Sequence, residues 1–407
     1  QENGDQSIAE WKRSLVEGWS DESAWNGSRL VSSILAERSM RVTLVMCFSF
    51  HITPLSMSIR HLLVLIPVSF GLHLFHANPL LIFIVSGLAI IPLSHMMVDA
   101  TKVLTKTWGR SVAGLINTTM GTLPDIFIGI SALTHGLGEF VKASITGAIM
   151  SNLLLGVGFG IVVAARKNPR GVRFDQDSSH LLSGLMLLAT IGLIIPAIFS
   201  ISTDTEREIS LEISIVLLVT YLASVVFTLK EPAKMSDMPD IAMDAPDSDV
   251  VSSVNGMPRA IGMLVSTGIV LALMSEILTH AVEPASRMLG FTPIFAGIFL
   301  LAPVGSAVEI VNVLRFASDK QFDLALAIAI GCSSQMALLA APLLVLTSEI
   351  LGQPMNLLFS EFQVVAVIIA VAAVNHILNI GTVRGISGIK LIAIYVMLGI
   401  GFYYQPA

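Results

Sequence analysis

Long apolar segments follow one another along most of this chain, and they constrain its fold more than any other feature. Eleven of them approach the ~20 residues that a helix needs to cross a bilayer. Inside a bilayer the chain must satisfy its own backbone amides and carbonyls, which leaves helices and closed barrels. Charged residues make up 13% of the sequence, whereas ~25% is usual for soluble domains. We therefore predict an all-α membrane protein.

The predicted helices form two similar halves preceded by one additional helix. We place membrane spans at about residues 60–76, 79–97, 109–133, 140–165, 179–200, 209–229, 259–283, 291–316, 322–348, 361–380 and 386–404. The expected domains are an N-terminal cytosolic or interfacial arm at 1–58, a first span at 59–78, a five-helix half at 79–230, an acidic cytosolic linker at 231–258 and a second five-helix half at 259–407. The polar first residues lack a basic stretch followed by an apolar core, so we expect no cleavable signal peptide.

Basic residues alternate along the loops between these spans. If the N-terminus is cytosolic, Arg110, Arg173 and Arg315 all fall in cytosolic loops, whereas Arg207 and Arg287 lie on the opposite side. Cytosolic loops of membrane proteins carry an excess of Lys and Arg. The pattern predicts a multi-pass protein with a cytosolic N-terminus. It leaves open whether the membrane is vacuolar, that of another organelle, or the plasma membrane.

Two carboxylates lie within the apolar segments in matching sequence contexts. Asp125 follows Gly121 by four residues in the third span, and Glu309 follows Gly305 by four residues in the eighth. A charge at membrane depth costs several kcal/mol unless it is paired, hydrated or neutralised, and ionisable residues there usually serve a function. Two acids in matching contexts therefore predict a site.

A repeat relates the two halves, because adding 184 to a residue number in the first half leads to a related residue in the second. The related pairs include Gly121 and Gly305, Asp125 and Glu309, and Ser151 and Gln335. The alternation of basic loops makes the two copies enter the membrane from opposite sides, so we predict inverted five-helix repeats. Secondary transporters are built in this way, with a midplane site at discontinuous helices. Pro124 and Pro303, each close to a repeat glycine, make both acid-bearing helices breakable there.

Oxygen atoms dominate the polar groups expected around the two acids. The predicted cation- and proton-binding set is Asp125, Glu309, Thr118, Thr122, Ser151, Asn152, Gly121, Gly305, Ser306, Ser333 and Gln335, with the two acids as the metal ligands. Oxygen ligands suit hard cations such as calcium, which takes six to eight of them, and no cluster of Cys and His points to a softer metal. Loss of water disfavours a charged carboxylate, so protons and a cation would compete for the pair. The alternative is that the hydroxyls only satisfy interhelical hydrogen bonds.

The predicted linker carries a run of acidic residues. These residues are Glu231, Asp237, Asp240, Asp244, Asp247 and Asp249. Runs of like charge are usually solvated connections. The alternative is a segment that gathers cations near a cytosolic entrance.

Both repeats resemble a known family. The stretch Gly109–Gly121 followed by Asp125 resembles the first signature of the CAX-type cation/proton exchangers, within the calcium/cation antiporter superfamily. Ser151–Leu155 fits the next helix, and Gly305–Glu309 with Asp323–Gln335 is similar to the second signature. The resemblance runs from about residue 60 to the end and implies eleven spans, calcium/proton exchange and a site on the two acids. Family members usually carry Glu at position 125, Asn at 122 and 306, and His at 310, where this chain has Asp125, Thr122, Ser306 and Ile310.

We therefore expect a secondary active transporter, not an enzyme, that exchanges a divalent cation, foremost calcium, for protons by alternating access. An exchanger of manganese, sodium or potassium at the same site is one alternative, and a passive channel is another. An intramembrane aspartyl protease also needs two acids, but here one acid is Glu and the surroundings repeat. We expect no cofactor and no nucleic-acid partner. The cation and protons are the substrates, the lipid bilayer is a partner, and a homo-oligomer stays open.

Overall fold

A computed structural model describes residues 62–105, 110–168, 171–174, 176–199, 206–230 and 256–405. All of them belong to the unit that runs from Leu55 to Ala407. The predicted N-terminal arm at 1–58 and the acidic residues of the linker lie outside the described residues.

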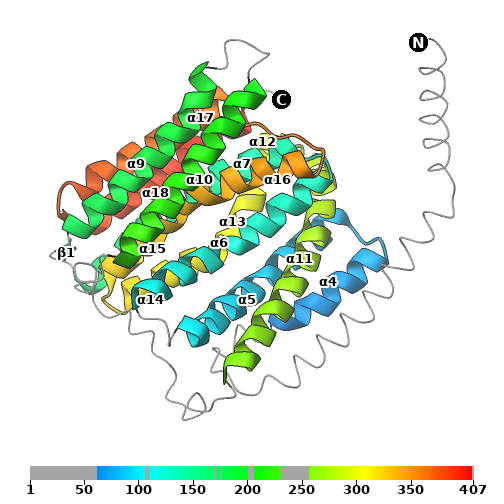
Figure 1. Cartoon of the computed structure of the whole chain (residues 1–407), viewed down its shortest axis with the longest axis horizontal. Coiled ribbons are helices and arrows are strands. Elements are labelled where there is room, and N and C mark those ends of the chain that lie inside the picture. The colour runs from blue at the N-terminus through cyan, green and yellow to red at the C-terminus, as the bar shows by residue number, and fades with distance from the viewer. Residues whose placement is uncertain are drawn as a thin grey trace. The chain divides into compact units, whose positions relative to one another are not determined.

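Helices make up most of the described chain (Figure 1). In chain order they are the 3-10 turn η1 (Leu62–Val64), α4 (Leu65–Leu74), α5 (Pro79–Thr105), α6 (Arg110–Thr134), α7 (Gly138–Met150), the π-helix η2 (Ser151–Gly156), α8 (Val157–Lys167), α9 (Gln176–Phe199), α10 (Glu206–Lys230), α11 (Gly256–Leu289), α12 (Pro293–Ala296), the π-helix η5 (Gly297–Leu301), α13 (Ala302–Gly305), α14 (Ala307–Ser318), α15 (Phe322–Gln335), the π-helix η6 (Met336–Ala340), α16 (Ala341–Ile350), α17 (Glu361–Leu378) and α18 (Gly385–Tyr403). Strands β1 (Val172–Arg173) and β2 (Thr382–Val383) form an antiparallel pair in which Val172 faces Val383.

Local sequence signals set several helix ends. Thr292 accepts a hydrogen bond from the amide of Phe295 at the start of α12 and is followed by a proline, an arrangement typical of a helix N-terminus. Ser360 and Gln363 form a capping box at the start of α17. Gly136, two residues after the end of α6, and Gly290, directly after α11, adopt positive φ, where a residue with a side chain would be strained.

Seven of the described helices are long and apolar enough to cross a membrane, or eight if a bent pair counts as one span. The seven are Pro79–Val98, Gly138–Lys167, Glu206–Phe227, Ala260–Leu289, Phe322–Ile350, Glu361–Leu378 and Gly385–Tyr403, and the bent pair is Pro293–Gly305 with Ala307–Ser318. Leu62–Leu74 and Ser183–Phe199 are shorter apolar helices. The prediction of a helical membrane protein is thereby confirmed at the level of class, while the exact count of eleven spans stays a prediction.

Outward-facing apolar side chains distinguish the helices at the rim of the bundle. In α10, Val216 and Val219 are exposed, as are Met397 and Ile400 in α18. Contiguous exposed apolar surface is rare on soluble monomers and marks a contact with lipid or with another apolar surface. Together with the span lengths, these faces indicate contact with the bilayer.

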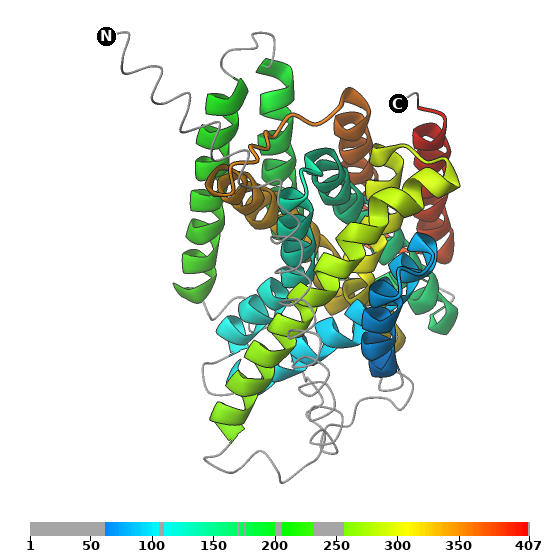
Figure 2. The ribbon, with the colours of Figure 1, turned by 90° about the vertical axis from the view of Figure 1, so that its right-hand side faces the viewer.

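Two apolar cores hold the bundle together. The larger core is centred on Leu153, Ile161 and Ala329, from the α7–α8 and α15 segments. The smaller core includes Ile90 and Leu271 and joins α5 to α11, with α4 packed against both (Figures 1 and 2). α6 contributes buried residues to both cores, so it forms part of their junction.

The two acid-bearing helices differ in shape. The second one bends by 56° between Gly305 and Ala307, where the sequence makes a break possible. α6 continues from Arg110 to Thr134 with Pro124 inside it, so this helix does not break although its proline makes a break possible. The φ angle of proline suits an α-helix, and a bundle in lipid tolerates the one backbone hydrogen bond that proline removes.

Candidate functional site

Asp125 lies in the middle of α6 with 5% of its surface exposed. Its carboxylate occupies the space that a side chain on Gly305 would fill, since a Cβ built there would lie 2.7 Å from the Asp125 Cγ. Only a glycine admits this approach, because real Cβ atoms do not come so close to other heavy atoms. The end of α13 and the first acid are therefore in direct contact.

Glu309 lies in the first turn of α14, directly after the bend, with 4% of its surface exposed. A Cβ built on Gly121 of α6 would lie 3.1 Å from the Glu309 Oε1. The contacts are thus reciprocal, because each acid packs on the glycine that precedes the other acid by four residues. The two carboxyl groups also interact electrostatically. The structure therefore brings together the four predicted residues Asp125, Glu309, Gly121 and Gly305.

A π-helix interrupts the helix that follows each acid-bearing helix, at positions that the offset of 184 relates. η2 covers 151–156, and adding 184 gives 335–340, which overlaps the 336–340 of η6. Single π-turns inside α-helices frequently mark functional sites. η2 packs against α14 and α15, and α6 packs against α7, α13 and α15. The elements that carry the predicted residues are therefore neighbours in space.

Several buried oxygen atoms of the predicted set accept no hydrogen bond from another residue in the described part of the chain. They are Asn152 Oδ1, Ser306 Oγ, Gln335 Oε1 and both carboxylate oxygens of Glu309. A buried polar group without a partner costs ~1–3 kcal/mol, and more when it is charged. Native proteins leave few such groups. Unpartnered oxygens on the elements that pack around two buried acids have the chemistry of a site for a hard cation.

Other predicted hydroxyls already have partners within their own helices. Thr122 donates to the Thr119 carbonyl at 2.9 Å, Ser151 to Ala148 at 3.2 Å and Ser333 to Ala329 at 2.8 Å. All three donor side chains are buried. The side chain of Thr118 lies outside the described part. These hydroxyl oxygens keep lone pairs for a ligand but do not require one.

Two residues near the site were not among those predicted from the sequence. Cys332 is buried in α15 and lies within electrostatic reach of both Asp125 and Glu309. Thr119, six residues before Asp125 on α6, hydrogen-bonds the Tyr221 hydroxyl of α10 at 2.9 Å. Cys332 could have been found from the sequence, because it lies one helical turn before the predicted site residue Gln335. No local pattern relates Thr119 to Tyr221, which lies 102 residues away.

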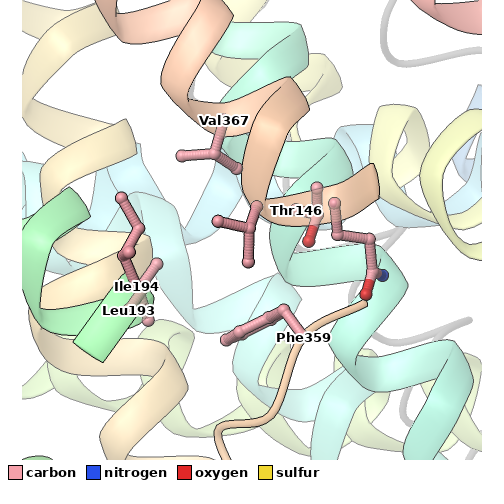
Figure 3. A pocket seen from close by; sticks show the side chains of 7 residues that line it. Thr146, Leu193, Ile194, Phe359 and Val367 are labelled. Carbon is pink, nitrogen blue, oxygen red and sulfur yellow. The ribbon is translucent and has the colours of Figure 1, made fainter. Parts of the chain in front are cut away.

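A small pocket is lined by residues of α7, α9, α17 and the segment before α17 (Figure 3). Its walls include Thr146, Leu193, Phe359 and Val367. None of the predicted site residues lines it. This apolar pocket is therefore not the candidate cation site.

Buried acids on neighbouring helices of a multi-pass bundle define a membrane protein of the ion-transporting class. The comparison with known families is more specific. The family model described as sodium/calcium exchanger protein matches residues 78–230 and 259–404, and the chain belongs to this family. The two matched ranges flank the acidic segment.

Relatives and solved structures agree with this family. The chain is 32% identical over 360 residues to a Ca(2+)/H(+) antiporter of Aphanothece halophytica, covering 85% of this chain and 96% of the relative. It is 30% identical over 394 residues to vacuolar cation/proton exchanger 3 of Oryza sativa subsp. japonica, covering 93% and 91%. The structure of native YfkE superimposes with a TM-score of 0.72 at 29% identity, covering 84% of this chain and all of the other. The resemblance to cation/proton exchangers is thereby confirmed.

Proposed function

We propose that this protein is a secondary active transporter that exchanges calcium for protons. The observation that carries the proposal is the pair of buried acids, Asp125 and Glu309, each packed on the glycine that precedes the other acid by four residues. Buried oxygens without partners on neighbouring elements add support. The relatives named as Ca(2+)/H(+) antiporter and cation/proton exchanger support the choice of ions.

The site residues have distinct roles in this proposal. Asp125 and Glu309 carry the charge that balances the cation, while Asn152, Ser306 and Gln335 supply neutral oxygens. Thr118, Thr122, Ser151 and Ser333 add hydroxyl oxygens, and Gly121 and Gly305 give the acids room. In the absence of a cation, apolar surroundings disfavour charged carboxylates, so the two acids bind protons. Calcium binding then releases protons, which couples the two fluxes through one site.

Alternating access requires the site to open to one side at a time. We propose eleven spans that form inverted repeats at 79–230 and 259–407, with the helix at 59–78 added in front. The matching π-helices η2 and η6 and the reciprocal glycine contacts support this symmetry. The bend at Ser306 supports a discontinuous helix of the kind that binds ions in transporters.

Contacts between loops agree with the proposed sides of the membrane. Lys142 donates to the Leu358 carbonyl at 3.1 Å, which joins two segments placed on the side opposite the cytosol. Val172 and Val383 pair between two segments placed in the cytosol. We propose a cytosolic N-terminus and, from the named relatives, a vacuolar or other organellar membrane or a plasma membrane. From the sequence we also propose that the acidic linker gathers cations and that the protein can assemble into a homo-oligomer.

Transport in proteoliposomes tests the function. With an imposed pH gradient, we expect the wild-type protein to accumulate calcium against its concentration gradient. Asp125→Asn and Glu309→Gln keep the shape of each side chain but remove its charge, so both should abolish uptake. Unchanged uptake in both variants contradicts the proposed site, and calcium movement that only runs downhill indicates a channel.

Competition distinguishes calcium from the alternative cations. Manganese, sodium or potassium in excess should inhibit calcium uptake only if it binds the same site. Compared with the usual family residues, this chain has a shorter acid at 125 and hydroxyls at 122 and 306 in place of amides. These differences change the number and reach of the oxygen ligands, so the order in which the ions inhibit reports which cation the site prefers. Calcium uptake unaffected by the other ions supports a calcium exchanger.

A further inference from the structure

Three potential metal ligands meet at one end of α6, outside the candidate transport site. His135 follows α6, while Glu276 and His280 lie one turn apart on α11. The His135 and His280 Nε2 atoms are 3.0 Å apart, and the Glu276 Oε1 lies 3.3 Å from the first and 3.7 Å from the second. Such convergence of two imidazoles and one carboxylate is the ligand set of many zinc sites.

Ser131 orients two of these ligands. Its backbone carbonyl accepts a hydrogen bond from the His135 Nδ1 at 2.8 Å, which fixes the proton on Nδ1 and leaves the Nε2 lone pair facing the cluster. Its hydroxyl donates to the Glu276 Oε2 at 2.7 Å, so Oε1 is the oxygen that faces both histidines. Outer partners of this kind set the tautomer and orientation of metal ligands.

The spacing of the three atoms fits a tetrahedral ion. Ligands at ~2.0–2.1 Å from zinc in tetrahedral directions lie ~3.3–3.4 Å apart, and the observed separations of 3.0, 3.3 and 3.7 Å bracket this value. The side chains of His135, Glu276 and His280 are 26%, 46% and 50% exposed, so the cluster lies at the surface of the bundle rather than in its core. We propose that His135, Glu276 and His280 bind a transition-metal ion of the zinc class, with water in the fourth position.

This site is separate from the acids in position and in chemistry. Ser131 lies six residues after Asp125 on α6, almost two helical turns away. Imidazole nitrogens favour zinc and similar ions, whereas calcium requires six to eight oxygens. Zinc binding at this cluster therefore does not depend on the proposed transport function.

Equilibrium binding of zinc to the purified full chain, with any affinity tag removed, tests the proposal. Competition with a chromophoric chelator measures the affinity without any transport assay. The titration is carried out in the Asp125→Asn/Glu309→Gln background, which removes the acids of the transport site as zinc ligands. We expect one zinc ion per chain in this background and no binding of calcium. Absence of stoichiometric zinc binding overturns the proposal.

Single substitutions in the same background assign the ligands. His135→Gln, His280→Gln and Glu276→Gln should each weaken zinc binding more than ten-fold, and Ser131→Ala about ten-fold through loss of orientation. Glu283→Gln on the same helix, paired with Arg287, and the exposed His376→Gln are matched controls that should bind zinc normally. Retained affinity in all three ligand variants overturns the assignment. Tetrahedral absorption of bound cobalt, lost on addition of zinc, provides a readout that requires no variant.

Discussion

At the scale of single residues, the space beside Gly305 is filled by the Asp125 carboxylate, so any side chain at position 305 displaces the acid. We predict that Gly305→Ala lowers calcium affinity ~5- to 140-fold, since overpacking costs ~1–3 kcal/mol and ~1.4 kcal/mol corresponds to a factor of ten. Calcium titration of the purified variant measures the effect.

A graded series of glycine substitutions provides the control. Gly121→Ala should have a smaller effect, because its Cβ would meet Glu309 at 3.1 Å rather than overlap it. Gly401→Ala in α18 meets nothing within 4 Å and should bind calcium like the wild type. An equal loss of affinity at all three positions would instead indicate a general effect of alanine on the bundle.

The orphaned hydroxyl of Ser306 and the satisfied hydroxyl of Ser333 make a second pair at this scale. Ser306→Ala removes a buried group without a partner, so we predict weaker calcium binding and a calcium-free protein more stable by ~1 kcal/mol. Ser333→Ala removes a hydroxyl that already bonds Ala329, so affinity should change less and stability should not rise. Thermal unfolding with and without calcium measures both quantities; a stability gain confined to Ser333→Ala contradicts the argument.

The acids were predictable because an ionisable residue inside an apolar span is costly and therefore uncommon. Their glycines were predictable because each precedes its acid by four residues in both halves. Partners of the polar groups were not predictable. Thr122 and Ser333 bond within their own helices, whereas Asn152 and Gln335 leave oxygens unpaired. From the sequence we assigned all four residues to the cation-binding set. Helical spacing does not reveal whether a side chain hydrogen-bonds the backbone carbonyl one turn earlier in its own helix.

At the scale of elements, the two acid-bearing helices are unequal although their sequences correspond. α6 is continuous through Pro124, whereas its counterpart bends by 56° at Ser306. Proline alone therefore did not decide where the helix breaks. The π-helices η2 and η6, which do correspond, had no sequence signal that we could identify beforehand, because one extra residue per turn leaves apolar composition unchanged.

The segment before α17 is anchored by a buried lysine. Lys142 of α7 forms an ion pair with Glu139 at 2.6 Å and donates to the Leu358 carbonyl at 3.1 Å and to Asn356 at 3.3 Å. We predict that Lys142→Met destabilises the protein by ~1.5–3 kcal/mol, the usual contribution of hydrogen bonds from charged groups. Thermal unfolding in detergent measures the loss. The exposed Lys390→Met is the control, and an unchanged midpoint for Lys142→Met would show that the anchor is dispensable.

At the scale of the whole molecule, proton and cation binding at one site has a defined pH dependence. Protons compete for the carboxylates of Asp125 and Glu309, so we predict that calcium affinity falls as the pH is lowered. Calcium titrations across a pH series, together with a pH-sensitive dye, measure the affinity and the protons released per ion. Affinity independent of pH, with no proton release, would contradict competition at one site.

A metal at the His135–Glu276–His280 cluster would tie α6 to α11, two helices that pack against each other near the junction of the two cores. If alternating access moves α6 relative to α11, zinc should slow calcium exchange. We predict several-fold inhibition by zinc that His135→Gln relieves, measured as calcium uptake in proteoliposomes. Glu283→Gln should remain sensitive to zinc, and uptake that zinc leaves unchanged would show that these helices keep their relative position during exchange.

The class of the whole molecule was accessible from sequence because bilayer thickness fixes the length of apolar helices. The cluster at the end of α6 was not, since it joins residues 145 positions apart in the chain. Loop alternation predicted sides of the membrane but not which side chains meet there.

The reciprocal packing of acids and glycines has a consequence for how such a chain changes over generations. Neither half holds a complete site, because each carboxylate rests on a glycine that the other half supplies. A change in the length of one acidic side chain therefore alters the packing on a glycine of the opposite half. A compensating substitution would have to arise in that half. A longer side chain at position 125 would therefore need more room beside Gly305, and a longer one at position 309 would need more room beside Gly121, so these four positions limit one another's variation.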